Sequence, residues 1–322
     1  MEYTRVTWQW AYDELWLKFR SEEFTFEKLL SVIFGKSAFS AREIKYGSKI
    51  INEMEDNGYV ISRKADYDQR VRLYRLLRPE LVSNAWAIFK KAAFAKGRKT
   101  FKVLSSDVLI REAHNRASWD YLFIKDAAIA FWTDNYRTSA VRHISVLEEQ
   151  ADGWVSLFKL LGLSVNLNGV PVSEAKGASE EAIGLHSDLQ SRQHKKGKEH
   201  YQAAEHVILE ALRDGDNLGA LAVLIAQRKQ LNWKTLIENA ATNGLINTLG
   251  FSLEYMNQEA GKQVFSAATI ERIRRKRQKE VETIKGVSGD EIAMGYKPLE
   301  EKWNAKCLDA DAYRKAVNDL VK

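Results

Sequence analysis

The chain has 322 residues, a formal net charge of +6 at pH 7 and a hydrophobic fraction of 45%. This length exceeds that of one ordinary core, so we expect two or three globular domains. The single cysteine, Cys307, excludes an intrachain disulfide and a cysteine-based zinc site within one chain. Charged residues interrupt the aromatic N-terminus, and no apolar run approaches the length of a membrane span. We therefore expect a cytoplasmic protein with no membrane partner, whose moderate basicity is compatible with a nucleic-acid partner.

The first 20 residues form an aromatic segment with helical periodicity. One helical face would carry Trp8, Tyr12, Leu15, Trp16 and Phe19. Two interpretations are open: a dimerisation helix, or a helix that packs on the domain that follows it. We favour the second.

The segment Phe26–Leu76 predicts a winged helix-turn-helix. Apolar residues at i, i+3, i+4, i+7 and i+8 from Phe26 indicate its first helix, and Gly35 is placed to end that helix. Ser40 and Glu43 have the spacing of a capping box, which would begin a short second helix.

The rest of this segment predicts a third helix and a hairpin. We expect Gly47 to break the second helix and Ser48 to cap the third. Two strand-like runs follow, Tyr59–Arg63 and Val71–Leu76, joined by the polar turn Lys64–Gln69. Three helices followed by a basic hairpin is the order that the winged fold requires.

The charge pattern of this segment favours DNA as its partner. Between Lys36 and Arg78 there are ten Lys or Arg residues against six Asp or Glu residues. We assign base contacts to Lys49 and Asn52, and contacts with the groove edge to Lys45 and Ser48. Phosphate contacts fall to the basic residues that flank the wing turn: Arg63, Lys64, Arg70 and Arg72. The alternative is that these are solvated charges on a domain that docks another protein.

The middle of the chain predicts a small α/β domain. Pro79 begins a helix that runs to about Ala95, and the basic run Gly97–Thr100 marks a domain boundary. Beyond it we expect alternating strands and helices: Tyr121–Ile124, Asp126–Trp132, Val141–Leu147, Ala151–Leu161 and Leu163–Leu167, the last before an Asn168-Gly169 turn.

The last third of the chain predicts helices after a polar linker. Residues 174–199 are rich in Ser, Gly, Lys and Glu, which indicates a linker with some helix around Glu180–Leu185. From His200 onward the apolar periodicity is helical, and after Gly286 we expect an irregular tail with one short helix. The basic helix Thr269–Lys285 carries arginines all around it, so most of them should face water.

No catalytic signature emerges from these segments. A nucleotidyltransferase needs a Gly-Ser turn and a pair of metal-binding carboxylates, but the strand and turn positions hold Ile124-Lys125-Asp126 and Arg142-His143. We interpret His143 as a partly exposed strand residue rather than an anion contact. His194 and His200 lack metal-ligand spacing, and Cys307 reads as an inert thiol. We therefore expect no metal and no cofactor.

The order of the domains resembles AbiEi-type antitoxins and their archaeal relatives. The resemblance rests on residues 126–134 after a strand, the Gly162-Leu163 break, Leu231-Asn232-Trp233 through Gly250–Leu253, and Gly295–Leu299. It implies a transcriptional repressor with a degenerate nucleotidyltransferase-like domain, encoded beside a nucleotidyltransferase toxin. The aromatic N-terminus and the polar linker depart from that family's pattern.

Taken together, the sequence predicts a mostly helical α+β protein. We expect a winged-helix domain with an aromatic N-terminal helix at 1–97, a nucleotidyltransferase-like α/β domain at 98–173, a linker at 174–199 and a helical domain at 200–322. The expected function is non-enzymatic: sequence-specific binding of double-stranded DNA by an antitoxin-like regulator, with a nearby-encoded toxin as a partner and homodimerisation to read two half-sites. The rival functions are a divergent nucleotidyltransferase acting on RNA or protein, and a winged-helix adaptor that docks proteins.

Overall fold

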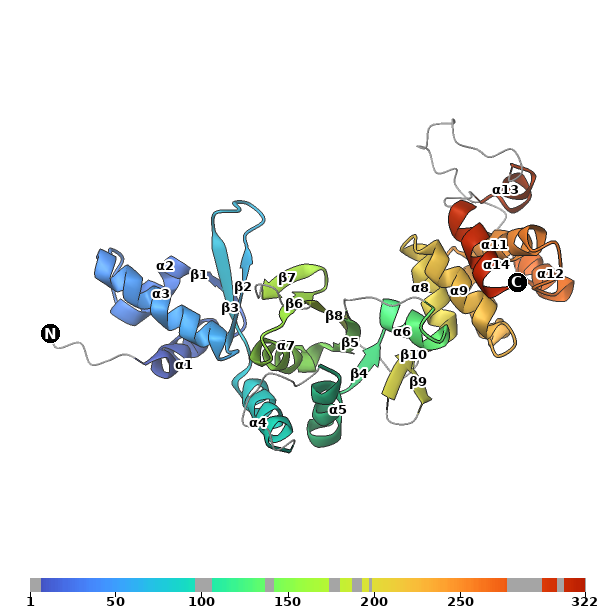
Figure 1. Ribbon diagram of the computed structural model, residues 1–322. Helices are drawn as coiled ribbons and strands as arrows, with labels where there is room; N and C mark the ends of the chain where they lie inside the picture. Colours follow the sequence, from blue (N-terminus) through green and yellow to red (C-terminus); the bar gives the residue numbers. More distant parts are fainter. Residues whose placement is uncertain are drawn as a thin grey trace. The chain divides into compact units, whose positions relative to one another are not determined.

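The computed structural model describes residues 7–95, 106–136, 142–173, 180–186, 193–196, 199–276, 297–305 and 310–321 (Figure 1). Within these ranges the protein is α+β and mostly helical. It divides into two compact units, the first formed by parts of 1–122, 140–191 and 195–200, the second by parts of 123–139, 192–194 and 201–322. Cys307, the Gly97–Thr100 boundary and the region 277–296 lie outside the described residues.

The first unit begins with three helices and a small antiparallel sheet. The elements follow one another as α1 (Trp8–Phe19), β1 (Glu23–Thr25), α2 (Phe26–Phe34), α3 (Ala41–Asp56), β2 (Val60–Lys64) and β3 (Arg72–Leu76). The strand order is β1-β3-β2, so β3 is central and β2 lies at an edge. Figure 1 shows β2 and β3 as an extended hairpin beside α3.

Local signals place the end of α2 and the start of α3 where the sequence predicts them. Gly35 follows α2 with a φ of +65°, a left-handed conformation that glycine adopts without strain. At the start of α3 the Ser40 amide donates to Glu43 Oε2 at 2.9 Å, and the Glu43 amide donates to Ser40 Oγ at 3.4 Å. This reciprocal pair is the predicted capping box.

The predicted break at Gly47 is wrong, because α3 is one continuous helix of 16 residues. Gly47 is buried against α2, and a Cβ atom built there would lie 2.3 Å from Leu30 Cδ2. The glycine therefore permits close approach of two helices rather than ending one. Ser48 does not cap a helix; its hydroxyl donates to the Ile44 carbonyl one turn earlier, at 3.0 Å.

The aromatic N-terminal segment packs on the domain that follows it, as we favoured. In α1 Ala11, Tyr12 and Leu15 are buried in the same core as α2 and α3. The Tyr12 hydroxyl donates to the Leu77 carbonyl at 2.7 Å, and burial raises the pKa of Tyr12 above its ordinary value. Strand β1, directly after α1, was not predicted, since three residues are too few to show a period.

The remainder of the first unit is an α/β layer. Its helices are α4 (Pro79–Ala95), α5 (Ser106–Ala117) and α7 (Ala151–Leu160), and its strands are β4 (Tyr121–Phe123), β5 (Arg142–Leu147), β6 (Ser164–Leu167), β7 (Val170–Ser173) and β8 (Glu180–His186). The strands lie in the order β7-β6-β8-β5-β4, with β6, β8 and β5 parallel. Asn168 and Gly169 form the predicted turn, which leads into the unpredicted antiparallel strand β7.

The expectation of a linker at 174–199 is wrong where the structure describes it. Strand β8 pairs with β5 on one side and with β6 on the other. Its centre is the short run Ala182-Ile183-Gly184, in which one isoleucine lies between two small residues, so the sequence shows neither a long apolar stretch nor an alternating pattern. Composition therefore concealed an inner strand, and the predicted helix there is absent from the described residues.

Asp152 joins the hairpin to the α/β layer. Its side chain, 5% exposed, accepts from Arg75 Nη1 at 3.0 Å and from Arg78 Nε at 3.3 Å. The Arg78 backbone amide also donates to it at 3.0 Å. Because Asp152 lies in the first turn of α7, its charge is also stabilised by the helix dipole.

The second unit is helical around one large core. It holds α6 (Lys125–Trp132), α8 (Ala204–Arg213), α9 (Asn217–Gln227), α10 (Trp233–Thr242), α11 (Ile246–Glu259), α12 (Ala267–Lys276), α13 (Lys297–Trp303) and α14 (Ala310–Leu320). The division between the units passes through β4, β9 (Gln193–Lys196) and β10 (Glu199–Gln202). We expected α6 in the middle domain, but it packs against α8 and α9, and its Phe131 ring stacks on Tyr201 at a centroid distance of 3.9 Å.

We predict that Asp152→Ala lowers the free energy of unfolding by about 3 kcal/mol, because it leaves two arginines without their buried partner. Urea unfolding followed by tryptophan fluorescence measures this loss. The control is Asp66→Ala, which removes a carboxylate that is 90% exposed and pairs with Arg63; it should cost less than about 1 kcal/mol. Equal losses of unfolding free energy in the two variants would contradict the inference that Asp152 holds the hairpin to the α/β layer.

Candidate functional site

The outer face of α3 gathers most of the predicted contact residues. Its inner face is formed by Glu43, Gly47, Ile50, Ile51 and Met54, all of which are buried. Opposite them, the side chains of Arg42, Lys45, Lys49 and Asn52 are exposed. Three cations and an amide thus share one helical stripe. Among the described residues, Lys49 is the one of these cations with an ion-pair contact, its Nζ lying 3.7 Å from Glu53 Oε1.

Two residues of this face differ from the expectation. Arg42 is not among the predicted contact residues, although one turn before Lys45 it extends the same basic stripe. Ser48 is half-buried, and its hydroxyl is engaged with the backbone of its own helix. Its predicted contact with a groove edge stays a prediction.

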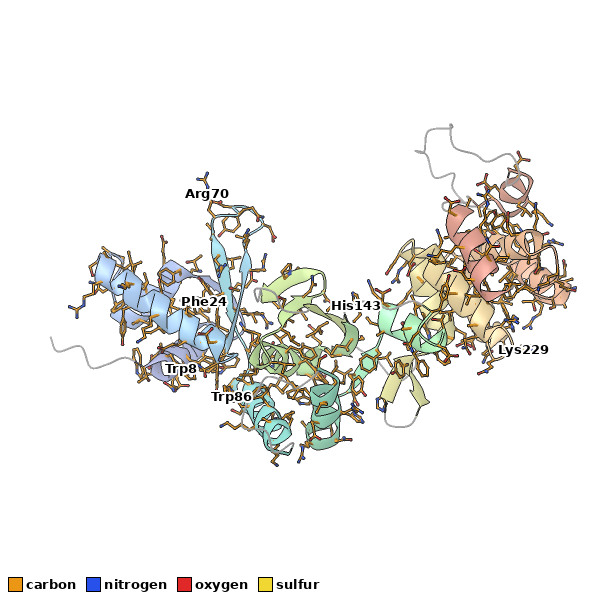
Figure 2. The ribbon with its side chains drawn as sticks, in the orientation of Figure 1. Trp8, Phe24, Arg70, Trp86, His143 and Lys229 are labelled. Atoms are coloured by element: carbon orange, nitrogen blue, oxygen red, sulfur yellow. The ribbon has the colours of Figure 1, made fainter. Side chains whose placement is uncertain are left out.

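The hairpin presents three further cations. Lys64 and Arg72 face each other in register across β2 and β3, and both are exposed. Arg70 lies at the tip of the hairpin, as Figure 2 shows. Its backbone amide donates to Asp68 Oδ1 at 2.9 Å, which shapes the turn and leaves the guanidinium to solvent.

Arg63 has a different environment from the other hairpin cations. Its Nε and Nη2 atoms donate to the two carboxylate oxygens of Glu23 at 2.7 and 2.8 Å, and Nη1 donates to Asp66 at 3.1 Å. These hydrogen bonds raise the pKa of Arg63 above its ordinary value. The bidentate pair joins β2 to β1 across the central strand. The hydrogen-bond donors of the Arg63 guanidinium are therefore used within the sheet.

The tip of the hairpin is not uniformly basic. Asp66 and Asp68 flank Tyr67, whose side chain is 74% exposed. The cations therefore concentrate on the helix and on the stem of the hairpin, whereas the tip carries both signs of charge.

A groove of about 660 Å³ runs beside β2. Residues of α3, the hairpin and β7 line it, together with Lys159 at the end of α7. The Lys159 ammonium donates to the Val60 carbonyl at 2.7 Å. Burial lowers its pKa to about 8, and the nearby carboxylates of Glu55 and Asp56 oppose that shift.

The histidines that the structure describes in the α/β layer are not grouped as metal ligands. His143 is partly exposed on β5, as expected. His200 is 7% exposed and packs against His114, with a centroid distance of 4.6 Å between the rings, and it stacks on Tyr121. Within the described ranges no group of three or more His, Cys, Asp or Glu side chains is arranged to hold a metal ion.

No protein-family model, curated protein or solved structure matches the chain. Among the described residues, no helix has both the length and the apolar character needed to cross a membrane.

We predict that the buried ammonium of Lys159 makes stability depend on pH above neutrality. Its pKa is about 8 when folded and near 10.5 otherwise, so between these values the unfolded chain binds more protons and folding becomes more favourable as pH rises. The stability gained by Lys159→Met over the parent should therefore be largest below about pH 8. It should shrink by about 2–3 kcal/mol as the pH approaches 10.5.

The measurement is urea unfolding of parent and variant across this range. Lys91→Met, at an exposed lysine of α4, is the matched control and should give a difference that does not change with pH. A pH-independent difference for Lys159→Met would contradict the lowered pKa.

Proposed function

We propose that residues 8–76 form a winged helix-turn-helix domain that binds double-stranded DNA. The observation that carries this proposal is the order α1-β1-α2-α3-β2-β3, with a three-stranded sheet β1-β3-β2 and an exposed basic stripe on α3. In that fold α3 enters the major groove and the β2–β3 hairpin is the wing. The aromatic α1 is then the first helix of the domain rather than an addition to it.

The exposed side chains divide into two kinds of contact. Lys49 and Asn52 read base edges, while Arg42, Lys45 and Ser48 meet the edge of the groove. The phosphate contacts are made by the hairpin cations that remain exposed, Lys64, Arg70 and Arg72. Arg63, which we first expected among them, instead holds the wing to β1 through Glu23.

The biological role that follows is a cytoplasmic, non-enzymatic transcriptional regulator. The resemblance to AbiEi-type antitoxins supports an antitoxin-like role, with a nucleotidyltransferase toxin encoded nearby and a degenerate nucleotidyltransferase-like middle domain. An enzyme of that class would need an acid pair on β5, where Arg142 and His143 stand. A homodimer would place two recognition helices on two half-sites.

One observation favours a second function, docking of another protein. On α1, the Trp10 side chain is 43% exposed and that of Leu17 is 68% exposed, and the two lie seven residues apart on one stripe. Such a stripe can be covered by a partner whether or not α3 binds DNA. A partner that co-purifies with the parent and is lost from a Trp10→Ala/Leu17→Ala variant, without any loss of DNA binding, would establish this second function.

We predict that Lys64→Ala/Arg70→Ala/Arg72→Ala weakens duplex binding at least tenfold at low salt. Each lost phosphate contact should reduce the slope of log K against log salt by about 0.9, so three contacts reduce it by about 2.7. Fluorescence anisotropy with a labelled duplex at several salt concentrations measures both quantities. The matched control, Lys91→Ala/Lys229→Ala/Lys234→Ala, removes the same charge from exposed positions on α4, after α9 and on α10, and should bind as the parent does.

A second prediction separates a positioning role of Arg63 from a phosphate contact. If Arg63 only fixes the wing, Glu23→Gln and Arg63→Gln break the same bridge. Both variants should then weaken DNA binding to a similar, moderate extent, and the slope of log K against log salt should change little. If Arg63 contacts phosphate, Arg63→Gln lowers the slope by about 0.9. Glu23→Gln would then strengthen binding, because it frees the guanidinium and removes a negative charge.

A further inference from the structure

The outer face of α1 carries two exposed apolar side chains with two carboxylates between them. Trp10 is 43% and Leu17 68% exposed, and Asp13 and Glu14 lie between them in the sequence. These four positions, which we call the α1 stripe, fall within about 100° of the helix circumference. They lie opposite the buried face with which α1 packs on α2, α3 and β3. The α1 stripe is therefore open to a partner without any change in the core.

The carboxylates of the α1 stripe are not neutralised within the domain. Asp13 is exposed and Glu14 is half-buried, and neither forms an ion pair or a side-chain hydrogen bond with a described residue. Lys18 follows Glu14 by one turn, but its Nζ lies over the ring of Phe19, 5.7 Å from the ring centroid. The α1 stripe thus presents negative charge between two apolar side chains.

The spacing of the apolar pair suits a helical partner. Trp10 and Leu17 are seven residues apart, which is about two turns and about 10 Å along the helix. A second helix packed at a small crossing angle repeats its contacts with the same period. An exposed tryptophan is among the side chains that contribute most to binding energy at protein interfaces. The carboxylates between the two apolar contacts favour cations at the facing positions of the partner.

A second copy of the chain does not fit the α1 stripe. In an antiparallel pairing about a two-fold axis, the register that brings Trp10 to Leu17 of the second copy also brings Asp13 to Glu14 of the second copy. Four carboxylates would then meet at the centre of the interface, and like charges placed together at an interface are costly. The same negative charge disfavours DNA as the partner of this face.

We propose that the α1 stripe binds a basic amphipathic helix of another protein. That helix carries two apolar residues seven positions apart, which pack on Trp10 and Leu17, and lysines or arginines between them, which pair with Asp13 and Glu14. The inference rests on the docking function proposed above and adds the chemistry of the partner. The α1 stripe shares no residue with the basic face of α3, so the two binding activities can be measured separately.

The test uses two alanine-rich helical peptides and the full chain, with binding followed by fluorescence anisotropy. One peptide has a leucine every seven residues and lysines three and four positions after each leucine, and the other has glutamates in place of the lysines. We expect saturable binding of the lysine peptide, at least tenfold tighter than that of the glutamate peptide. Trp10→Ala and Leu17→Ala should each weaken it at least fivefold, with little change in melting temperature because both side chains are exposed.

A charge reversal tests the carboxylates directly. Asp13→Lys/Glu14→Lys should reverse the preference, so that the glutamate peptide binds more tightly than the lysine peptide. The matched control is Glu27→Lys/Glu238→Lys, which makes the same change of charge at exposed positions on α2 and α10 and should leave the preference for the lysine peptide unchanged.

Three results would overturn the proposal. They are no saturable binding of the lysine peptide, equal binding of the two peptides, and self-association of the chain in sedimentation velocity that Trp10→Ala/Leu17→Ala abolishes, since a second copy would then cover the α1 stripe. The proposed functions fail differently. DNA binding fails in the duplex titration while peptide binding persists, and docking as such fails when Trp10→Ala/Leu17→Ala retains every co-purifying partner.

Discussion

The carboxylate of Asp152 is the interaction on which the first unit depends. It receives Arg75 from the end of the hairpin and Arg78 from the segment that leads into α4, so both are anchored to the first turn of α7. At the other end of the same helix, Lys159 donates to the Val60 carbonyl at the start of β2. One helix of ten residues thus holds the hairpin at two points. Loss of either contact would leave a buried charge without its partner, which is costly, so both contacts hold the hairpin to α7.

A hairpin held at its base can place cations at a fixed distance from α3. The Arg63–Glu23 bridge adds a third fixed point, because it joins β2 to β1 across the central strand. The cations outside this bridge, those of the α3 stripe and of Lys64, Arg70 and Arg72, remain exposed. The two groups of charges therefore have different roles. The paired charges hold the elements of the domain together, and the exposed cations are available to bind phosphates with release of counterions.

The parts of this fold that follow from neighbouring residues could be predicted from the sequence, and the parts set by distant residues could not. The helix Phe26–Phe34 and the capping box of Ser40 and Glu43 are local signals, and both are confirmed. Gly47 looks like a helix break in the sequence, since only the position of Leu30 reveals that it is a packing residue. Strand β8 is stabilised by β5 and β6 rather than by its own composition. At the candidate site, the sequence predicts the basic character of α3 and of the hairpin. It does not reveal that Arg63 bonds to Glu23, because the two residues are 40 positions apart.

The most direct test of the account is a salt titration of duplex binding by the purified full chain. The DNA upstream of its own gene is compared with random duplex of equal length. The account predicts tight binding that weakens steeply with salt and a clear preference for the upstream DNA, because base contacts from α3 add to the phosphate contacts of the hairpin. Equal and weak binding to both duplexes would contradict sequence-specific recognition. It would make protein docking through α1 the leading function.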